Sequence, residues 1–305
     1  MIGYLARRAL LGLAIIAVVS LSVFVLTNVA VDPATVIAGE GASQSDIESV
    51  RRAYGLDRPV AARYFAWLGN AAKGNLGDSY RQKRPVINIV RERLPVTVGL
   101  ACLSLAISLA ISLPLAIAAA VRRNSVWDRL ALAISVVGQA VPAFWIALLC
   151  ILVFSVHLSW LPASGSTSFA HFVLPAFTLS FYSTPSLLRL TRAGLIEVLQ
   201  SDYIRTARAK GLRPRKILLQ HALRNALAPV IAIASVQFGF MLSGSVVIET
   251  IFAMQGIGYL AWEAVTSADL PLVQALVLVT AFFYIVLTLA ADVLNAWLDP
   301  RIRLA

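Results

Sequence analysis

The sequence predicts an all-α polytopic membrane protein with six transmembrane helices and both termini in the cytoplasm. The first observation is composition: of 305 residues, 59% are hydrophobic and 13% are charged, whereas soluble domains are about half apolar and about a quarter charged. The second is that several apolar runs exceed the roughly 20 residues needed to cross a bilayer. The third is that arginine and lysine gather in short segments between those runs, as they do in cytoplasmic loops.

An N-terminal transmembrane helix is predicted in residues 1–31. Arg7 and Arg8 precede the apolar stretch 9–31, an order that also occurs in signal peptides. The stretch is longer than the roughly 7–15 apolar residues of a signal sequence, and no convincing cleavage site follows before Asp32. We therefore expect a retained first span.

The segment 32–95 is predicted to be extracytoplasmic, because it has no apolar run long enough to cross a membrane. Three stretches in it have the spacing of amphipathic helices, namely 45–54, 59–68 and 86–94. The last of them is expected to lie on the membrane surface. These helices either pack on the outer face of the protein's own spans or form a docking surface for an external protein.

Residues 96–305 are predicted to form the transmembrane core. Its apolar runs indicate spans at about 96–121, 130–156, 171–190, 228–248 and 271–297. Pro142 is expected to bend the second of these, because proline removes a hydrogen bond from a helix interior. The hydrophilic region 191–227 lies between the third and the fourth.

The distribution of cations predicts the orientation. With the N-terminus inside, the basic residues of 122–129 and of 189–224 lie in the cytoplasm, and the two short outer loops contain no lysine or arginine. The ten cations of segment 32–95 do not conflict, since segments beyond about 60 residues cross largely regardless of charge. Topology thus explains the net charge of +11. No aromatic-and-basic motif indicates a nucleic-acid partner.

Motifs of catalysis and nucleotide binding are absent from the sequence. There is no Gly-x4-Gly-Lys-Ser/Thr loop and no His-Glu-x-x-His, and His157, His171 and His221 share no metal-ligand spacing. We expect neither catalysis nor a cofactor or metal in this chain. A proton-driven carrier needs ionisable groups at membrane depth, and the predicted spans hold almost none. Asp292 is the nearest candidate, close to the cytoplasmic end of the last span.

The basic region has the pattern of a helix, a sharp turn and a second helix. Asp202 is expected to cap a helix over 203–210, Gly211 to end it in the left-handed conformation, and Pro214 to begin the next helix. Ala207 has little side chain, which permits close approach by a partner, and the surrounding cations supply charge. The alternative is a basic loop that only sets topology and touches water and lipid head groups.

The predicted spans also carry prolines and small or polar residues that are candidates for a substrate path. Small residues in membrane helices most often serve close helix packing. The alternative is a polar lining that offers hydrogen bonds to a passing substrate. The candidate lining residues are Gln139, Ser183, Gln237, Met241, Ser243 and Gly244.

Longer motifs resemble a known family. Residues 205–223 read Arg-Thr-Ala-x3-Gly-x9-His-x-Leu, which is similar to the Glu-Ala-Ala-x3-Gly-x9-Ile-x-Leu-Pro coupling motif of ABC import permeases; Arg205 stands in place of Glu and Arg224 in place of Pro. The wider sequence resembles the dipeptide, oligopeptide and nickel permease family, and within it the first of the two permeases. The resemblance is carried by residues 55–57, 74–77, 84–86, 93–95, 202–212, 221–227, 237–239 and 298–303. Gln255 departs from the proline that the family usually has.

The resemblance implies a type I ABC importer permease in the bacterial cell membrane. Its expected partners are a second homologous permease, two cytoplasmic ATPases that bind ATP and magnesium, an extracytoplasmic substrate-binding (lipo)protein that contacts segment 32–95, and a di- or oligopeptide substrate. Nickel or another small solute is the alternative within the family, and a stand-alone secondary carrier or channel is the alternative from another class. The residues expected to contact the ATPases are Tyr203, Arg205, Thr206, Ala207, Lys210, Gly211, Arg213, Pro214 and Lys216.

Overall fold

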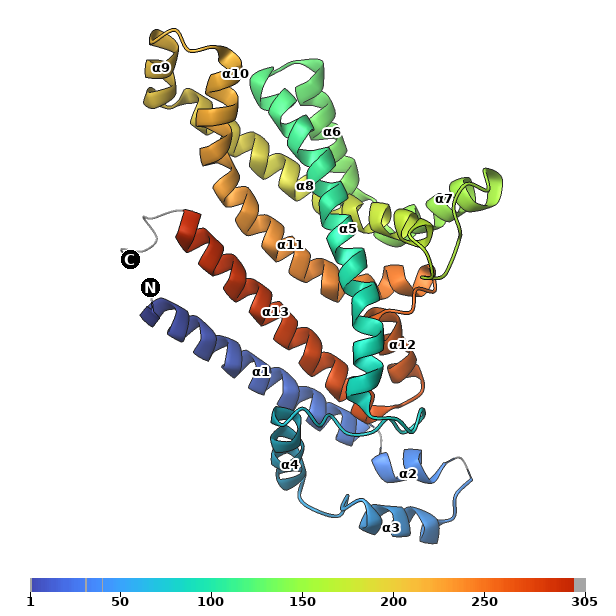
Figure 1. The fold of residues 1–305 in the computed structure, drawn as a ribbon. Helices are drawn as coiled ribbons and strands as arrows, with labels where there is room; N and C mark the ends of the chain where they lie inside the picture. The colour runs from blue at the N-terminus through green and yellow to red at the C-terminus, as the bar shows by residue number, and fades with distance from the viewer. Residues whose placement is uncertain (1, 31, 40, 299–305) are drawn as a thin grey trace. The chain divides into compact units, whose positions relative to one another are not determined.

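The structure is a computed structural model that describes residues 2–30, 32–39 and 41–298, and in them it is built almost wholly of helices (Figure 1). The chain divides into two compact units. The N-terminal unit comprises residues 2–97 and 255–285, and the central unit comprises residues 98–254 with the chain from 286 onward.

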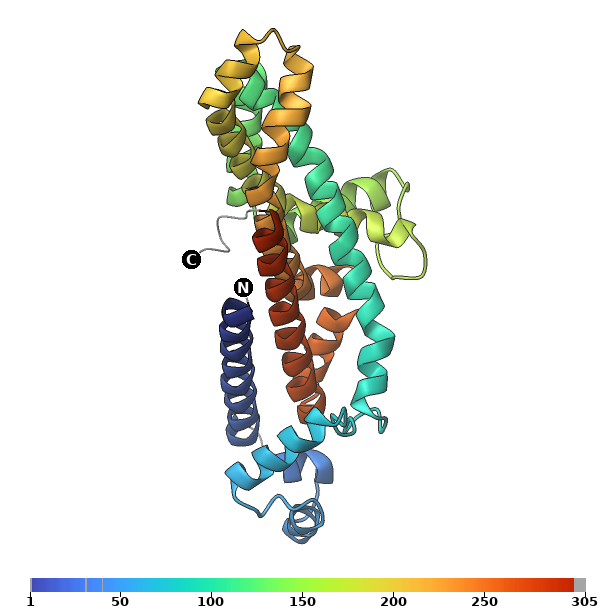
Figure 2. The ribbon, with the colours of Figure 1, turned by 60° about the vertical axis from the view of Figure 1, so that its left-hand side comes forward.

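Within the described residues, the N-terminal unit is made of five complete helices and parts of two longer ones. Their bounds are α1 (Ile2–Ala30), α2 (Pro33–Ala38), α3 (Gln44–Ala53), α4 (Val60–Ala72), the start of α5 (Val86–Val121), α12 (Ile257–Thr266) and most of α13 (Leu270–Leu298). Helices α1 and α13 lie side by side and antiparallel (Figures 1 and 2). The Gln274 amide donates to Thr27 Oγ1 at 2.8 Å near one end of the pair. Near the other end, a Cβ added to Gly12 would lie 2.6 Å from Ile285 Cγ2, so any larger residue at position 12 would force Ile285 to move.

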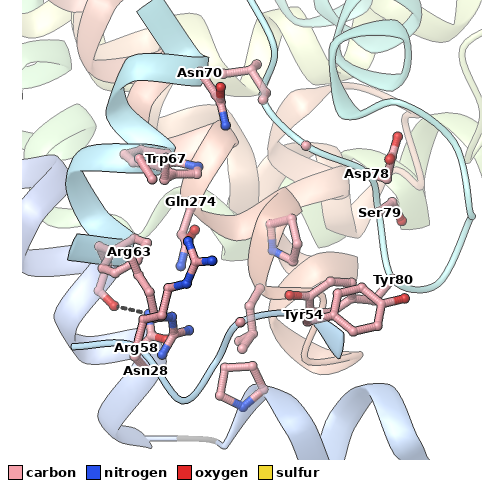
Figure 3. A pocket seen from close by; sticks show the side chains of 18 of the residues that line it. Asn28, Tyr54, Arg58, Arg63, Trp67, Asn70, Asp78, Ser79, Tyr80 and Gln274 are labelled. Atoms are coloured by element: carbon pink, nitrogen blue, oxygen red, sulfur yellow. Dashed lines mark hydrogen bonds between the residues drawn. The ribbon is translucent and has the colours of Figure 1, made fainter. Parts of the chain in front are cut away.

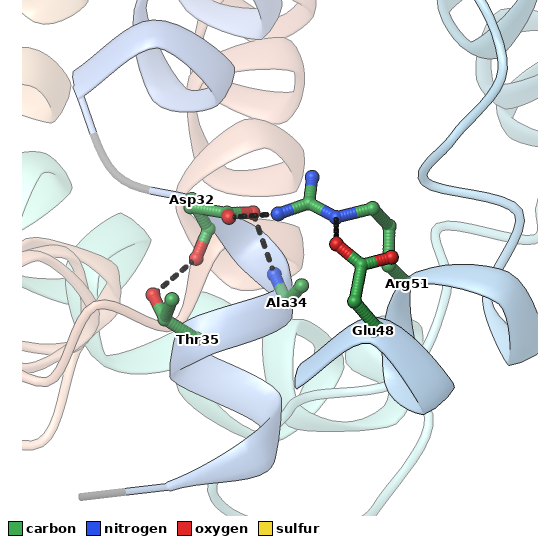
Figure 4. Close-up of polar contacts among 5 residues, drawn as sticks. All are labelled: Asp32, Ala34, Thr35, Glu48 and Arg51. Carbon is green, nitrogen blue, oxygen red and sulfur yellow. Dashed lines mark hydrogen bonds and ion pairs between the residues drawn. The ribbon is translucent and has the colours of Figure 1, made fainter. Parts of the chain in front are cut away.

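Local caps order the chain between α1 and α4. The Asp32 carboxylate accepts the Ala34 N–H at 3.0 Å and so caps α2, and its other oxygen accepts from Arg51 of α3 at 2.5 Å (Figure 4). Ser43 and Asp46 form a capping box at the start of α3. The Ser43 hydroxyl that donates to Asp46 lowers the pKa of that carboxyl. Helix α3 confirms the helix expected over 45–54.

The core of the N-terminal unit contains the first turns of α5. Val86, Ile89 and Val90 are buried against residues of α12 and α13 such as Leu260 and Leu276. The helix expected to lie on the membrane surface over 86–94 is therefore part of the same continuous helix as the predicted span 96–121. Residues 86, 89 and 90 have the spacing of one helix face, and that face packs inside the protein.

The central unit is organised around α8 and α11. Its elements are the rest of α5, α6 (Val126–Ala140), α7 (Ala143–Cys150), a π-helical segment η1 (Ile151–His157), α8 (Ala170–Gln200), α9 (Asp202–Ala209), α10 (Pro214–Lys216), a second π-helical segment η2 (Ile217–Ala222) and α11 (Leu223–Ile251). The side chains of α5 and α8 interlock through buried hydroxyls: Ser108 Oγ lies 2.5 Å from Ser183 Oγ and 2.9 Å from Thr184 Oγ1.

A buried ion pair joins α6 to α8. Arg192 donates to the two oxygens of Asp128 at 2.5 and 3.0 Å, and the Asn124 N–H donates to the same carboxylate at 2.9 Å. Asp128 is almost fully buried, with 3% of its surface exposed. A buried carboxylate needs this many donors because its desolvation is costly.

Pro142 breaks the predicted span 130–156. Helix α6 ends at Ala140, Val141 is extended, and α7 starts at Ala143 at an angle of 99° to α6. The residue before a proline is driven out of the helical region by steric contact with the ring. The expected bend is therefore present, and it is sharp enough to give either a broken span or a re-entrant loop.

Within the described residues, three helices are long and apolar enough to cross a membrane, and two bent pairs raise that number to at most five. The second bent pair, Pro214–Leu227 with Pro229–Ser243, turns by 49°. The predicted span 171–190 lies inside the 31-residue α8, whose composition leaves it outside these candidates. The count of six spans and the cytoplasmic location of both termini stay predictions, and residues 299–303 of the resemblance lie outside the described part.

Candidate coupling surface and substrate path

Helix α9 forms as the basic region predicts, with one difference at its start. The cap residue is Ser201, whose backbone is extended, and Asp202 is the first residue of the helix. Asp202 was expected to be the cap, so this position is corrected by one residue. Its carboxylate lies in the first turn, where a negative charge favours the helix dipole, and lies 3.1 Å from the Arg205 guanidinium.

The turn after α9 has the expected glycine geometry. Gly211 has φ of +73°, and no atom lies within 4 Å of where its Cβ would be. The Leu212 N–H donates to the Ala207 carbonyl at 3.3 Å, and the Gly211 N–H donates to the Arg208 carbonyl at 2.9 Å. This pair of bonds is the Schellman arrangement that ends a helix. Pro214 then occupies the first turn of α10, as predicted.

One face of α9 is buried within its own unit. Ile204 and Ala207 lie three residues apart and pack with Leu195 of α8 and Ile217 of η2. That Ala207 meets a partner's surface stays a prediction, but the residue is only 8% exposed and packs inside its own unit. The reason is helix periodicity: the small residue shares a face with Ile204, and that face covers the apolar core.

The other predicted coupling residues are on the surface. Tyr203 is 44% exposed, and its hydroxyl accepts from the Asn225 amide of α11 at 2.8 Å. In both views α9 and α10 lie at the end of α8 and α11 (Figures 1 and 2). The exposed members of the set are Tyr203, Arg205, Thr206, Lys210, Gly211, Arg213, Pro214 and Lys216. We call these eight residues the coupling surface.

Four of the predicted path residues line one cavity of the central unit. The cavity has a volume of about 480 Å³ between α7, α8 and α11, and its lining includes Ser183, Gln237, Met241 and Ser243. Gln139 and Gln237 line a neighbouring cavity of about 470 Å³. Gly244 belongs to α11, but its surroundings lie outside what the structure describes.

The polar members of this lining differ in what they can offer. Ser183 is buried and its hydroxyl contacts Ser108 and the Ser180 carbonyl, so it serves helix packing. Ser243 donates to the Gly239 carbonyl at 3.3 Å. No hydrogen bond to the Gln237 amide is found among the described residues, and Gln237 borders both cavities. Gln237 therefore has polar groups available to a substrate, as does Tyr182, which also borders both cavities.

The aromatic part of this lining was not predicted from the sequence. Phe144, Tyr182 and Phe240 border the first cavity and are 49%, 61% and 53% exposed. They occur in apolar runs, where periodicity cannot separate a cavity-facing ring from a lipid-facing one. Only the polar hydroxyl of Tyr182 was a usable signal.

The chain belongs to the family of binding-protein-dependent transport system inner membrane components, which matches residues 112–304. The corresponding N-terminal family, the membrane component of binding-protein-dependent transport systems, matches residues 1–101. The protein is thus a multi-pass inner-membrane permease component of an ABC transporter and is not itself catalytic.

Similar proteins extend over the whole length of the chain. The glutathione transport system permease protein GsiC of Escherichia coli K12 is 39% identical over 304 residues, which is 99% of each chain. A Brucella abortus protein named as a permease of a peptide transport system is 36% identical over 312 residues, again 99% of each. The fold is similar to that of the inward-facing MetNI methionine ABC transporter, with a TM-score of 0.57 and 16% identity over 69% of this chain and 96% of that one.

Proposed function

We propose that this permease pairs with a second, homologous permease to form the path by which di- or oligopeptides enter the cell. An external binding protein delivers the peptide, and two cytoplasmic ATPases supply the driving motion. The observation that carries the proposal is the similarity to permeases named for peptide and glutathione transport, at 36% and 39% identity over 99% of the chain. Glutathione is itself a tripeptide, so the two names indicate one chemical class of substrate.

The coupling surface supports the role of the ATPases. A lever must be rigid within itself, and α9 is held by its buried face, by the Schellman turn at Gly211 and by the Tyr203–Asn225 hydrogen bond. It must also present groups to a partner, and the coupling surface carries Arg205, Lys210, Arg213 and Lys216. ATP-bound and ATP-free ATPases have to bind this surface with different free energies, since otherwise no motion would follow.

The cavity of α7, α8 and α11 supports a peptide path without a tight site. Its rings and aliphatic side chains accept varied peptide side chains, and the Gln237 amide both donates to and accepts from a peptide backbone. Weak binding in the path is what an importer needs when the binding protein sets specificity. The break at Pro142 places irregular backbone beside the cavity, as in transporters whose interrupted helices border a substrate site.

Uptake by the reconstituted complex of both permeases and ATPases tests this proposal, with the binding protein and a labelled tripeptide outside the liposomes. We expect uptake that requires ATP and survives dissipation of the membrane potential, and competition by unlabelled glutathione or tripeptide. Uptake that continues without ATP would assign the chain to the carriers instead.

The coupling surface is tested by the double variant Arg205→Glu, Lys210→Glu. We expect a tenfold or greater loss of uptake and of peptide-stimulated ATP hydrolysis, because reversed charges across an interface oppose binding. The matched control is Arg123→Glu, which changes an exposed cation of the turn before α6. Normal uptake in the double variant would contradict the proposed role of α9.

A further inference from the structure

A polar pocket of about 780 Å³ lies in the N-terminal unit, away from every residue proposed above for coupling or path. Its walls come from α1, the end of α3, α4, the loop 76–83 and the start of α13 (Figure 3). The volume is within the range of about 300–1,000 Å³ that is usual for sites of small molecules.

The lining is strongly cationic. It contains Arg52, Arg58, Arg63 and Lys83 but only one acidic residue, Asp78. In the described part of the chain, no carboxylate lies within ion-pair distance of these four cations. Four cations and one anion around one pocket create a positive potential that attracts negative charge.

Arg51, which precedes the pocket residue Arg52, is neutralised by carboxylates of the same unit. Arg51 forms ion pairs with Asp32 and Glu48 (Figure 4). The other carboxylate near the pocket, Asp269, accepts the Ser79 hydroxyl and the N–H groups of Tyr80 and Arg81. Asp32 and Asp269 thus bind groups other than the four pocket cations, which leaves Asp78 as the one carboxylate in a lining with four cations.

Two of the cations, Arg63 and Arg58, are placed by neighbouring residues of the pocket. Arg63 donates to the Asn28 side-chain oxygen (Figure 3), and burial lowers the pKa of its guanidinium. Gly55, with φ of +63°, has no side chain, and the Arg58 Nε lies 3.5 Å from the position of the missing Cβ. Arg58 therefore folds over the turn into the pocket. The ordering of Arg63 lowers the entropy that this part of the lining loses when a ligand binds.

Neutral donors and rings complete the lining. Tyr54 and Tyr80 lie on one side of the view in Figure 3, and Trp67 and Asn70 on another. Burial raises the pKa of the Tyr80 hydroxyl, so it stays protonated and can donate. Amide groups can both donate to and accept from a peptide backbone, whereas a phosphate uses donors alone and has no chain to lie against the rings.

We propose that this pocket binds the carboxylate of a short peptide, held by Arg52, Arg58 and Lys83 with the peptide chain against Tyr54, Tyr80 and Trp67. The inference rests on the proposed function for the class of substrate, and on the predicted extracytoplasmic side for segment 32–95. The permease would then hold arriving substrate by its charged end before the peptide enters the path.

Calorimetric titration of the full-length permease in phosphatidylcholine nanodiscs tests the proposal. The probes are trialanine with a free carboxylate, trialanine C-terminal amide and inorganic phosphate. We expect the free acid to bind at least tenfold more tightly than the amide, since a charge-assisted hydrogen bond to a carboxylate is among the stronger polar contacts. Phosphate is expected to bind more weakly than the free acid.

Two variants locate the site. Arg58→Gln and Lys83→Gln are each expected to weaken binding of the free acid about tenfold and to leave the amide unaffected. The control Arg91→Gln changes an exposed cation of α5 that does not line the pocket. Unchanged melting temperatures in all three variants exclude misfolding as the cause.

Three results would overturn the inference: equal binding of acid and amide, equal binding of phosphate and acid, or unaltered binding in both pocket variants. The proposed function is tested separately, by the assay of ATP-dependent peptide uptake. Loss of peptide uptake in the wild-type complex with retained trialanine binding would reject the transport proposal and leave the pocket standing. ATP-dependent peptide uptake together with absence of trialanine binding would reject only the pocket.

Discussion

The coupling surface and the cationic pocket both gather arginine and lysine, but they are built differently. The coupling surface comes from 14 consecutive positions, 203–216, and its geometry follows from local bonds at Ser201, Gly211 and Pro214. The pocket is assembled from five separate segments, joined by contacts such as Ser79 with Asp269, which are 190 positions apart. The geometry of the coupling surface should therefore be insensitive to substitutions elsewhere in the fold. The geometry of the pocket should depend on each contact between distant segments. The following substitutions test this contrast, beginning with the largest expected effect.

The largest effect is expected from Asp269→Ala. The change leaves the Ser79 hydroxyl and two backbone N–H groups without their acceptor, and each buried donor left without a partner costs about 1–3 kcal/mol. We expect a lower melting temperature and loss of trialanine binding, because the loop 79–83 is released from the residue that precedes α13. Asp57→Ala, an exposed carboxylate, is the control. Normal trialanine binding by the Asp269→Ala variant would show that the pocket does not need this distant contact.

Ala207→Leu is expected to cost about 2 kcal/mol, because extra methyl groups in a packed interior force neighbours apart. Ala207 packs with Leu195 and Ile217, so the larger side chain should displace α9 and lower uptake as well as melting temperature. Thr206→Leu places the same side chain on the exposed neighbour, and stability should change by less than about 0.5 kcal/mol. Equal decreases in the melting temperatures of the two variants would mean that the buried face of α9 has been assigned wrongly.

Gly211→Ala is expected to destabilise by about 1 kcal/mol, the cost of a left-handed backbone with a Cβ. There is space for the new methyl group, so the effect isolates conformation from packing. Coupled ATP hydrolysis should fall while trialanine binding stays normal. Gly69→Ala is the matched control, since Gly69 lies inside α4 with open space around it and has an ordinary φ. That substitution should be neutral or stabilising in a thermal melt.

The smallest effect on stability is expected from Arg205→Ala. Arg205 and Asp202 form an exposed pair three residues apart, with side chains 79% and 92% exposed. Such pairs contribute less than about 0.5 kcal/mol, so the melting temperature should hold while affinity for the ATPases falls in a co-purification titration. A large drop in melting temperature would indicate that the cations of α9 are structural and that no surface is reserved for a partner.

The local features of this chain were accessible from sequence because they depend on neighbours along the chain. Gly211 and Pro214 predict the turn, and the structure confirms both. Ser201 was missed as the cap because Asp202 is an equally good capping residue by type. The burial of Ala207 was missed for another reason: a small residue fits either a partner's surface or an internal interface, and only packing with α8 and η2 distinguishes them.

The sequence by itself determined the membrane class, the permease family motifs, the basic helix and its turn, and the break at Pro142. Each of these depends on composition, on helix periodicity or on a backbone restriction of one residue. Tertiary structure alone decided which face of α9 is exposed, that Gln237 borders two cavities, and that Arg58 and Lys83 share a pocket with Tyr80. Those properties depend on which distant segments meet, and the free energy of their meeting is spread over many weak contacts that no short pattern records.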